Sequence, residues 1–367
     1  MQLQKYSRQF VPSSWPSPSQ SNIVRRLRRC DRHRKGRKTM LRGCNDISRV
    51  GLVGGGVIGT GWAVRCLANG LDVSMTDPAP GAEARTRENI ARIWPTMEQI
   101  GLAEGASVDR FSFHQTIEAA VAEADFVHEN VPEREDVKTT VIAEISQHAS
   151  EEVIISSSSS GLLPSSIQSQ AVAPERVIIG HPFSPLYILP LVELVGGDKT
   201  SAEAIGKAAG YFTRIGMRPL HVRNEIEAYI GDRLQEALWH EALHLVNDGI
   251  ATMQEVDAAI TGGPGLRWAF MGIGMGWHVA AGEGGMRVNM KHFAPTLELP
   301  WTKLEAPPFT EQLNDLVVEG CEAQQGDRHW LEMEQRRDQA LIKIREVIDQ
   351  YWYPEDQDGW PEVQELP

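Results

Sequence analysis

The most restrictive feature of this sequence is a glycine-rich turn that follows a short apolar run. Residues 50–53 predict a buried strand, and a helical pattern after the turn ends at Gly70. The turn reads G-x-G-x-x-G: Gly54 permits the tight turn, Gly56 lets the backbone approach a pyrophosphate, and Gly59 lets the helix pack close to the strand. A pyrophosphate would lie at the positive end of the helix, so the segment predicts a dinucleotide-binding unit.

The residues around this turn indicate which dinucleotide it binds. Val57 and Ile58 complete the turn and are expected to lie beside the cofactor. A second strand is predicted at 72–76 and is followed by Asp77, which stands 23 residues after Gly54. A carboxylate there accepts hydrogen bonds from both ribose hydroxyls and repels a 2′-phosphate, so NAD is favoured over NADP. The alternative is that Asp77 is only a turn residue.

Strand and helix patterns alternate through the rest of the first half. Apolar strands are predicted at 126–128, 153–155 and 177–179, with a helix at 137–149. Such alternation is typical of an α/β fold with a Rossmann-type, doubly wound and mostly parallel sheet. The ligand crevice of such a sheet lies beyond the carboxyl ends of its strands, where we expect the functional residues.

The second half of the chain has a helical pattern and predicts a smaller all-α C-terminal domain. Apolar residues from Ile226 onward recur every three or four positions and predict a long helix that ends near Gly249. Further helices are expected at 252–260 and 330–351. We expect four parts, namely a basic disordered extension at 1–46, an NAD-binding Rossmann domain at 47–222, a helical substrate and dimerisation domain at 223–330, and a charged helix and tail at 331–367.

Charge and composition exclude several classes of function. The chain has 367 residues and a formal net charge of −13, with +11 in residues 1–49 and −24 in the remainder. A negative body repels phosphate backbones, so we expect no nucleic-acid partner for the folded part. The apolar runs are shorter than the ~20 residues of a membrane helix, so no membrane association is expected. The 4 cysteines are spaced too widely for a disulfide scaffold or a zinc site.

The basic N-terminal extension has no apolar run of signal-peptide length. Its composition favours a disordered tail, or a translation start placed too early, with Met40 as a natural start. An Arg-rich and Ser-rich start is also typical of a mitochondrial transit peptide or of a nucleic-acid-binding arm. We therefore expect a cytoplasmic protein, with the mitochondrial matrix as the alternative if residues 1–39 are a transit peptide.

Residues suited to catalysis follow the predicted strands. A run of serines ends at Ser160, His181 follows a strand, and Glu193 stands 12 residues later. This arrangement suits a general-base pair in which the glutamate fixes the imidazole tautomer and stabilises the imidazolium. No metal is expected, because the other histidines lack a ligand spacing such as H-E-x-x-H, and the nucleophile motif Gly-x-Ser-x-Gly is absent. The alternative is that His181 is a structural histidine.

Three segments resemble the 3-hydroxyacyl-CoA dehydrogenase superfamily, and the resemblance covers roughly residues 49–325. They are the glycine turn at 53–59, the end of the serine run at 160–164, and the region 181–193 with His-Pro-Phe-Ser-Pro and Leu-Val-Glu. The resemblance implies a dehydrogenase that removes hydride from a 3-hydroxyl group and passes it to NAD.

The resemblance also implies roles for individual residues. His181 matches the general base, Glu193 its orienting partner, and Ser160 the hydroxyl that hydrogen-bonds the substrate oxygen. Glu133 and Lys138 match positions near the nicotinamide end of the cofactor.

Within the superfamily, the chain is most similar to members that oxidise the 3-hydroxyl of L-carnitine to 3-dehydrocarnitine. The segments that carry this similarity are 129–136, 215–223, 236–249, 266–269 and 299–304. One departure from the acyl-CoA members supports a different substrate, because their asparagine in a Phe-Ile-Val-Asn-Arg-Leu-like segment is replaced by Asp232.

The expected substrate explains this departure. Carnitine carries a trimethylammonium group without an N–H, which aromatic faces and a carboxylate bind best. Asp232 is expected to supply the anion, and Arg267 to pair with the substrate carboxylate. The residues expected to line this pocket are Asp232, Phe183, Tyr187, Arg267, Trp268 and Phe270. The alternative for each tryptophan is a place in the core or in a dimer interface.

The sequence therefore predicts an NAD-dependent 3-hydroxy acid dehydrogenase that acts on carnitine and forms a homodimer. Members that act on L-gulonate or on a 3-hydroxyacyl-CoA remain alternatives, because they would share Ser160 and the histidine–glutamate pair. A non-enzymatic NAD-binding protein, similar to the lens crystallin of this lineage, is a further alternative. The intact Ser160, His181 and Glu193 argue against it.

Overall fold

The structure is a computed structural model. It describes residues 40–269, 272–281, 285–293, 299–303, 310–313, 315 and 327–351. The chain divides into two units, Met1–Met40 and Leu41–Pro367, and the fold and the site lie in the second.

An eight-stranded sheet forms the centre of the first half, in the order β3-β2-β1-β4-β5-β6-β7-β8. The strands are β1 (Arg49–Val53), β2 (Asp72–Thr76), β3 (Phe111–His114), β4 (Phe126–Glu129), β5 (Ile154–Ser157), β6 (Val177–Pro182), β7 (Leu191–Gly196) and β8 (Arg218–Val222). Neighbouring strands are parallel except β6 and β7, which are antiparallel. The expected α/β fold with a mostly parallel sheet is confirmed.

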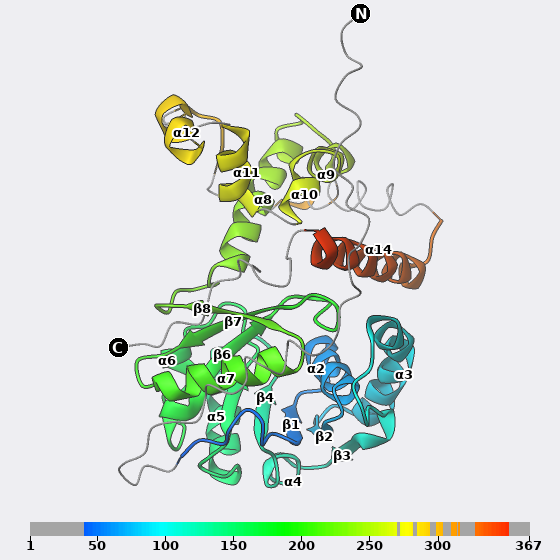
Figure 1. The fold of residues 1–367 in the computed structure, drawn as a ribbon, viewed down its shortest axis with the longest axis vertical. Coiled ribbons are helices and arrows are strands. Elements are labelled where there is room, and N and C mark those ends of the chain that lie inside the picture. The colour runs from blue at the N-terminus through cyan, green and yellow to red at the C-terminus, as the bar shows by residue number, and fades with distance from the viewer. Residues whose placement is uncertain are drawn as a thin grey trace, which may run out of the picture. The chain divides into compact units, whose positions relative to one another are not determined.

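Helices cover both faces of this sheet (Figure 1). They are α2 (Val57–Ala68), α3 (Ala82–Ile100), α4 (Ile117–Val121), α5 (Glu135–His148), α6 (Pro164–Ile167) and α7 (Ala202–Arg214). Side chains of β1 alternate between the two faces: Val50 and Leu52 pack with residues of α2, α3 and α7, whereas Val53 packs with residues of α4, α5 and α6. The sheet is therefore buried on both sides, as a parallel sheet requires.

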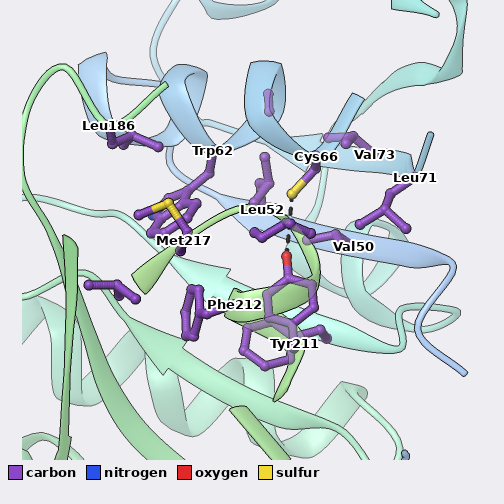
Figure 2. Packing of buried hydrophobic residues seen from close by; sticks show 14 of the residues in the cluster. Val50, Leu52, Trp62, Cys66, Leu71, Val73, Leu186, Tyr211, Phe212 and Met217 are labelled. Carbon is purple, nitrogen blue, oxygen red and sulfur yellow. Dashed lines mark hydrogen bonds between the residues drawn. The ribbon is translucent and has the colours of Figure 1, made fainter. Parts of the chain in front are cut away.

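The core between the sheet and α2 contains a buried chain of polar contacts, of which Figure 2 shows the one between Cys66 and Tyr211. The Trp62 ring stacks on His128 with centroids 4.5 Å apart. His128 Nε2 lies 3.0 Å from the Tyr211 hydroxyl, which lies 3.3 Å from Cys66 Sγ. Burial lowers the pKa of His128 to about 3, so this histidine is neutral at physiological pH.

The second half is helical, as expected, but it differs in detail. Its described helices are α8 (Gly231–Asn247), α9 (Met253–Thr261), α10 (Pro264–Trp268), α11 (Gly272–Ala280), α12 (Gly285–Phe293) and α14 (Trp330–Tyr351). The long helix begins at Gly231 and not at Ile226, because Ala228 and Tyr229 adopt left-handed backbone conformations with φ of 58° and 50°. In the described residues of the glycine-rich region, where the sequence has little periodicity, α10, α11 and α12 are short helices.

Residues 41–46 were expected to belong to the extension, but they pack on the sheet domain. Leu41 and Cys44 are buried, and Arg42 forms an ion pair with Asp125. Asp125 also accepts hydrogen bonds from the Ser48 and Arg49 backbone, so one carboxylate fastens the start of the folded chain. Residues 1–39 lie outside the described part. Within that part, we find no helix with the length and apolarity needed to span a membrane.

Candidate active site

The structure brings His181 and Glu193 together on adjacent antiparallel strands. The register of β6 and β7 pairs these two residues directly, which places their side chains on the same side of the sheet. The imidazole Nδ1 donates to Glu193 Oε2 over 3.0 Å, and both side chains are buried. Because a carboxylate only accepts, this contact puts the ring proton of a neutral His181 on Nδ1 and leaves the Nε2 lone pair free for a substrate proton.

The second oxygen of Glu193 holds the beginning of α8. Oε1 accepts hydrogen bonds from the backbone N–H groups of Ile230 and Gly231, over 3.0 and 2.9 Å. A carboxylate is stabilised at a helix N-terminus, where these N–H groups have no partner within the helix. One buried side chain thus fixes both the imidazole and the helix that carries Asp232.

Asp232 lies beside the reactive edge of the imidazole. Its Oδ2 is 3.6 Å from His181 Nε2, and its side chain is 25% exposed. Burial raises the pKa of Asp232. The negative charges of the nearby Glu193, Glu236 and Glu133 raise it further, whereas the interaction with His181 lowers it. The carboxylate therefore faces several negative groups and favours a cation beside it.

An aromatic ring closes another side of this position. The Phe183 ring lies 4.8 Å from that of His181 between centroids. A methyl group on Gly231 would lie 2.3 Å from this phenyl ring, so the start of α8 needs a glycine for the close approach. The Phe183 ring and the Asp232 carboxylate therefore both lie close to the imidazole of His181.

The serine loop after β5 is fastened by Glu133. This carboxylate accepts hydrogen bonds from the Ser159 hydroxyl and from the backbone N–H groups of Ser160 and Gly161, the latter two over 3.0 and 2.9 Å. Partial burial opposes ionisation, but these bonds and the charge of Lys138 prevail and lower the pKa of Glu133. Ser160, the expected substrate contact, is half-buried within this loop.

Lys138, which was expected near the nicotinamide end of the cofactor, is fully buried. Its Nζ donates to Glu129 Oε1 and to the Val131 carbonyl, each over 3.0 Å, and lies 3.5 Å from Glu133 Oε2. The Ser157 hydroxyl donates to Glu129 as well. Sequence reasoning missed Glu129 as the partner of Lys138, although a glutamate that ends a strand nine residues before a lysine was a usable signal.

The glycine turn forms a cradle at the N-terminus of α2. Gly54 has φ of +101°, and a methyl group there would lie 2.6 Å from the Asn130 carbonyl oxygen. A methyl group on Gly59 would lie 1.9 Å from the Gly54 carbonyl oxygen. At Gly56 it would meet no atom within 4 Å, so open space lies in front of the helix N-terminus. Val57 is exposed and Ile58 half-buried at the same end.

Asp77 lies against this turn and fits an NAD ribose. Its Oδ2 accepts from the Gly55 N–H over 2.7 Å, and Oδ1 from the Ala79 N–H over 2.8 Å. Each oxygen keeps lone-pair capacity for the two ribose hydroxyls. Together with the cradle at Gly56, these groups suit a dinucleotide without a 2′-phosphate.

The structure also describes the surroundings of other residues expected in the substrate pocket. Tyr187 is buried with its hydroxyl on Asp338 of α14, 2.9 Å away. Arg267 and Trp268 are on α10, which packs against α9 and α11, and Arg267 is exposed. Phe270 lies outside the described residues. Asp232 and Phe183, two of the residues expected in this pocket, lie beside His181.

The fold and the site together define an NAD-dependent dehydrogenase. A glycine turn and an acidic residue after β2 suit the dinucleotide, and a histidine oriented by a buried glutamate suits proton transfer. In the part of the chain that the structure describes, we find no group of three or more His, Cys, Asp or Glu side chains that could hold a metal ion.

Comparison with known proteins identifies the family within this class. The family model described as "3-hydroxyacyl-CoA dehydrogenase, NAD binding domain" matches residues 49–226, and the one described as "3-hydroxyacyl-CoA dehydrogenase, C-terminal domain" matches residues 229–326. The chain belongs to the 3-hydroxyacyl-CoA dehydrogenase family, and its cofactor is NAD.

Curated relatives of high similarity share one name. The chain is 52% identical over 310 residues to an L-carnitine dehydrogenase of Bacillus cereus, a match that covers 84% of this chain and 95% of that protein. It is 53% identical over 296 residues to an L-carnitine dehydrogenase of a Pseudomonas species, a match that covers 81% of this chain and 92% of the relative.

Solved structures show the same fold at lower identity. A 5-formyl-3-hydroxy-2-methylpyridine 4-carboxylic acid 5-dehydrogenase, described as an NAD+-dependent dismutase, matches with a TM-score of 0.71 and 24% identity, over 83% of this chain and 99% of that one. A (S)-3-hydroxybutyryl-CoA dehydrogenase from Ralstonia eutropha matches with a TM-score of 0.56 and 22% identity, over 75% of this chain and 95% of that one.

Proposed function

We propose that this protein oxidises the 3-hydroxyl of L-carnitine to 3-dehydrocarnitine with NAD as the hydride acceptor. The observation that carries the proposal is the position of His181, with Nδ1 on buried Glu193 and Nε2 3.6 Å from Asp232. A base with an anion at its reactive edge suits a substrate that carries a cation close to its hydroxyl. The names of the relatives, at about half of all positions identical, support the same substrate.

His181 removes the hydroxyl proton while the hydride leaves the carbon that bears this hydroxyl and passes to NAD. Nε2 accepts the proton, and Glu193 stabilises the imidazolium that forms. The Ser160 hydroxyl donates a hydrogen bond to the substrate oxygen and holds it in place. Gly56 and the N-terminus of α2 hold the pyrophosphate of NAD, and Asp77 the ribose hydroxyls. Bound NAD supplies the hydride acceptor.

Asp232 binds the trimethylammonium group. In carnitine a single methylene separates the carbinol carbon from the quaternary nitrogen, so the cation lies within a few bonds of the oxygen that His181 deprotonates. Asp232 is the carboxylate next to the atom that accepts the proton, and Phe183 offers an aromatic ring beside the same imidazole. Cation–π contacts contribute about 0.5–2 kcal/mol, and a carboxylate adds the attraction of opposite charges.

A comparison of three substrates tests the proposal. Formation of NADH is measured with L-carnitine, L-gulonate and 3-hydroxybutyryl-CoA under identical conditions. We expect carnitine to be oxidised with by far the highest kcat/KM, because only this substrate carries a cation for Asp232. A higher kcat/KM for gulonate or the CoA ester, or NAD binding without turnover of any of the three, would reject the proposal.

We further propose that the protein is a cytoplasmic homodimer, joined through the helical part at 223–330. Within the described residues, large exposed apolar side chains gather on these helices, namely Leu234, Leu238 and Trp239 of α8, Leu266 of α10, and Ile273 and Trp277 of α11. Exposed apolar side chains that form a contiguous patch are typical of a protein–protein interface. The occupant that we propose for these side chains is a second copy of the chain.

A further inference from the structure

The loop that joins β6 to β7 connects the two residues of the proposed base. It covers residues 183–190, directly after the strand with His181 and directly before the strand with Glu193. Its first residue, Phe183, lies against the imidazole. Any shift of this loop therefore moves the aromatic side of the substrate position.

Helix α2 holds this loop from one side. Arg65 Nε donates to the Leu186 carbonyl over 2.9 Å, and the same guanidinium reaches the Ile215 carbonyl over 3.1 Å. A methyl group on Gly61 would lie 2.7 Å from Leu186, so the loop fits closely against the helix. Leu186 belongs to the same core as Trp62 (Figure 2).

Helix α14 holds the loop from another side. The Tyr187 hydroxyl donates to Asp338 Oδ2 over 2.9 Å, and both side chains are buried. Arg345 Nη1 donates to the Ile188 carbonyl over 2.8 Å. Ile342 of the same helix is buried as well. These contacts come from residues beyond 326, where the match to the C-terminal family model ends.

We propose that Asp338 is a positioning residue for substrate binding, which acts through Tyr187 on the loop at 183–190. A buried hydrogen bond to a carboxylate is among the stronger ones in a protein, and it fixes the Tyr187 ring and the backbone around it. The loop then presents Phe183 beside His181 at the place of the substrate cation. Because Glu193 fixes His181 independently, the contact with α14 governs substrate affinity more than the chemical step. This inference rests on the proposed function, since it concerns the same substrate position.

The test uses Asp338→Asn, Tyr187→Phe and the double variant, with Lys343→Ala on the exposed side of α14 as control. Steady-state kinetics give KM for carnitine, KM for NAD and kcat of each variant. We expect each single variant to raise KM for carnitine by about three- to tenfold, the effect of one lost hydrogen bond, with kcat and KM for NAD within about twofold. The double variant is expected to be no worse than the poorer single variant, because Asp338→Asn weakens the same bond that Tyr187→Phe removes.

The outcomes separate this inference from the proposed function. A wild-type enzyme that does not oxidise carnitine contradicts the proposed function itself. An active wild type whose Tyr187→Phe variant has the same KM for carnitine as Lys343→Ala overturns the positioning role. Equal increases in KM for carnitine and for NAD, or additive effects in the double variant, overturn it too, since a general loss of structure would produce them. Tyr187→Phe removes only a hydroxyl, so the test does not depend on how well Asp338→Asn folds.

Discussion

The imidazole of His181 has a carboxylate at each of its nitrogens, and the two carboxylates differ in their surroundings. Glu193 is fully buried, and its second oxygen accepts hydrogen bonds from two backbone N–H groups, so the side chain is held in one orientation. Asp232 is a quarter exposed and keeps access to a ligand. A buried carboxylate held in one orientation suits the support of a base, whereas a partly exposed carboxylate suits the binding of a charged substrate.

At the same scale, the sequence was informative for side chains in motifs and uninformative for distances. His181, Glu193 and Ser160 could be named from a recognisable pattern, although His181 lies within β6 and Glu193 within β7. The distance of Asp232 from Nε2 depends on where α8 begins, which is set by the contact of Glu193 with Ile230 and Gly231. No local pattern encodes such a tertiary contact.

Replacement of the proposed base tests its role. His181→Ala is expected to lower kcat by about 10²–10⁴-fold, the usual contribution of a general base. The affinity for NAD is expected to stay unchanged, because the glycine turn and Asp77 belong to other elements. Turnover and NAD titration of this variant, beside His148→Ala on the exposed end of α5 as control, check this expectation. Normal turnover by His181→Ala would remove the histidine from the mechanism.

At the scale of elements, two features place the site and neither was predicted. The antiparallel pairing of β6 and β7 sets His181 opposite Glu193, whereas the sequence suggested only two apolar segments. The late start of α8 follows a turn in which Tyr229 has a positive φ and donates its hydroxyl to the Leu162 carbonyl over 2.8 Å. Left-handed residues other than glycine are strained, and such strain is common at functional sites.

His128 of β4 is buried against Trp62 of α2 and Tyr211 of α7, and its burial predicts an effect of pH on stability. The unfolded chain protonates this histidine below its ordinary pKa of about 6.5, while the folded protein binds that proton only near pH 3. Stability is therefore lost as the pH falls through this interval, by about 2 kcal/mol between pH 6.5 and 5 from this one group. Well above pH 6.5 this loss of stability is absent.

Urea unfolding of the wild type and of His128→Gln at pH 7.5 and pH 5 measures this effect. The glutamine keeps a polar contact for Tyr211 but does not titrate. We expect the wild type to lose about 2 kcal/mol more than the variant on acidification. Equal losses would mean that His128 is already charged or already exposed in the folded protein.

At the scale of the whole molecule, the two halves that differ in sequence pattern also supply different parts of the site. The alternating half forms the sheet that holds the glycine turn and the base, and the helical half supplies Asp232 and several exposed apolar side chains. The alternation and the long amphipathic helix were readable because their periodicities are strong. The short helices at 264–293 were not, because glycines and tryptophans obscure the period of 3.6.

The proposed dimer can be tested on this surface. Leu238 of α8 is 43% exposed, and Leu238→Glu would bury a charge in the interface if two copies meet there. We expect the wild type to be a dimer and this variant a monomer by light scattering after size-exclusion chromatography. Val172→Glu, at an exposed position of the sheet domain, is expected to remain a dimer. A monomeric wild type would contradict the proposed assembly.

The selection of a cation by Asp232 is measured most directly with an uncharged isostere of carnitine, 3-hydroxy-5,5-dimethylhexanoate, which has a carbon atom in place of the quaternary nitrogen. The measurement is the ratio of kcat/KM for L-carnitine to that for the isostere, in the wild type and in Asp232→Asn. We predict a ratio of about 100 or more for the wild type, as expected for a close and partly desolvated pair of opposite charges, and a fall toward 1 in the variant. A ratio that is the same in both proteins would contradict the account.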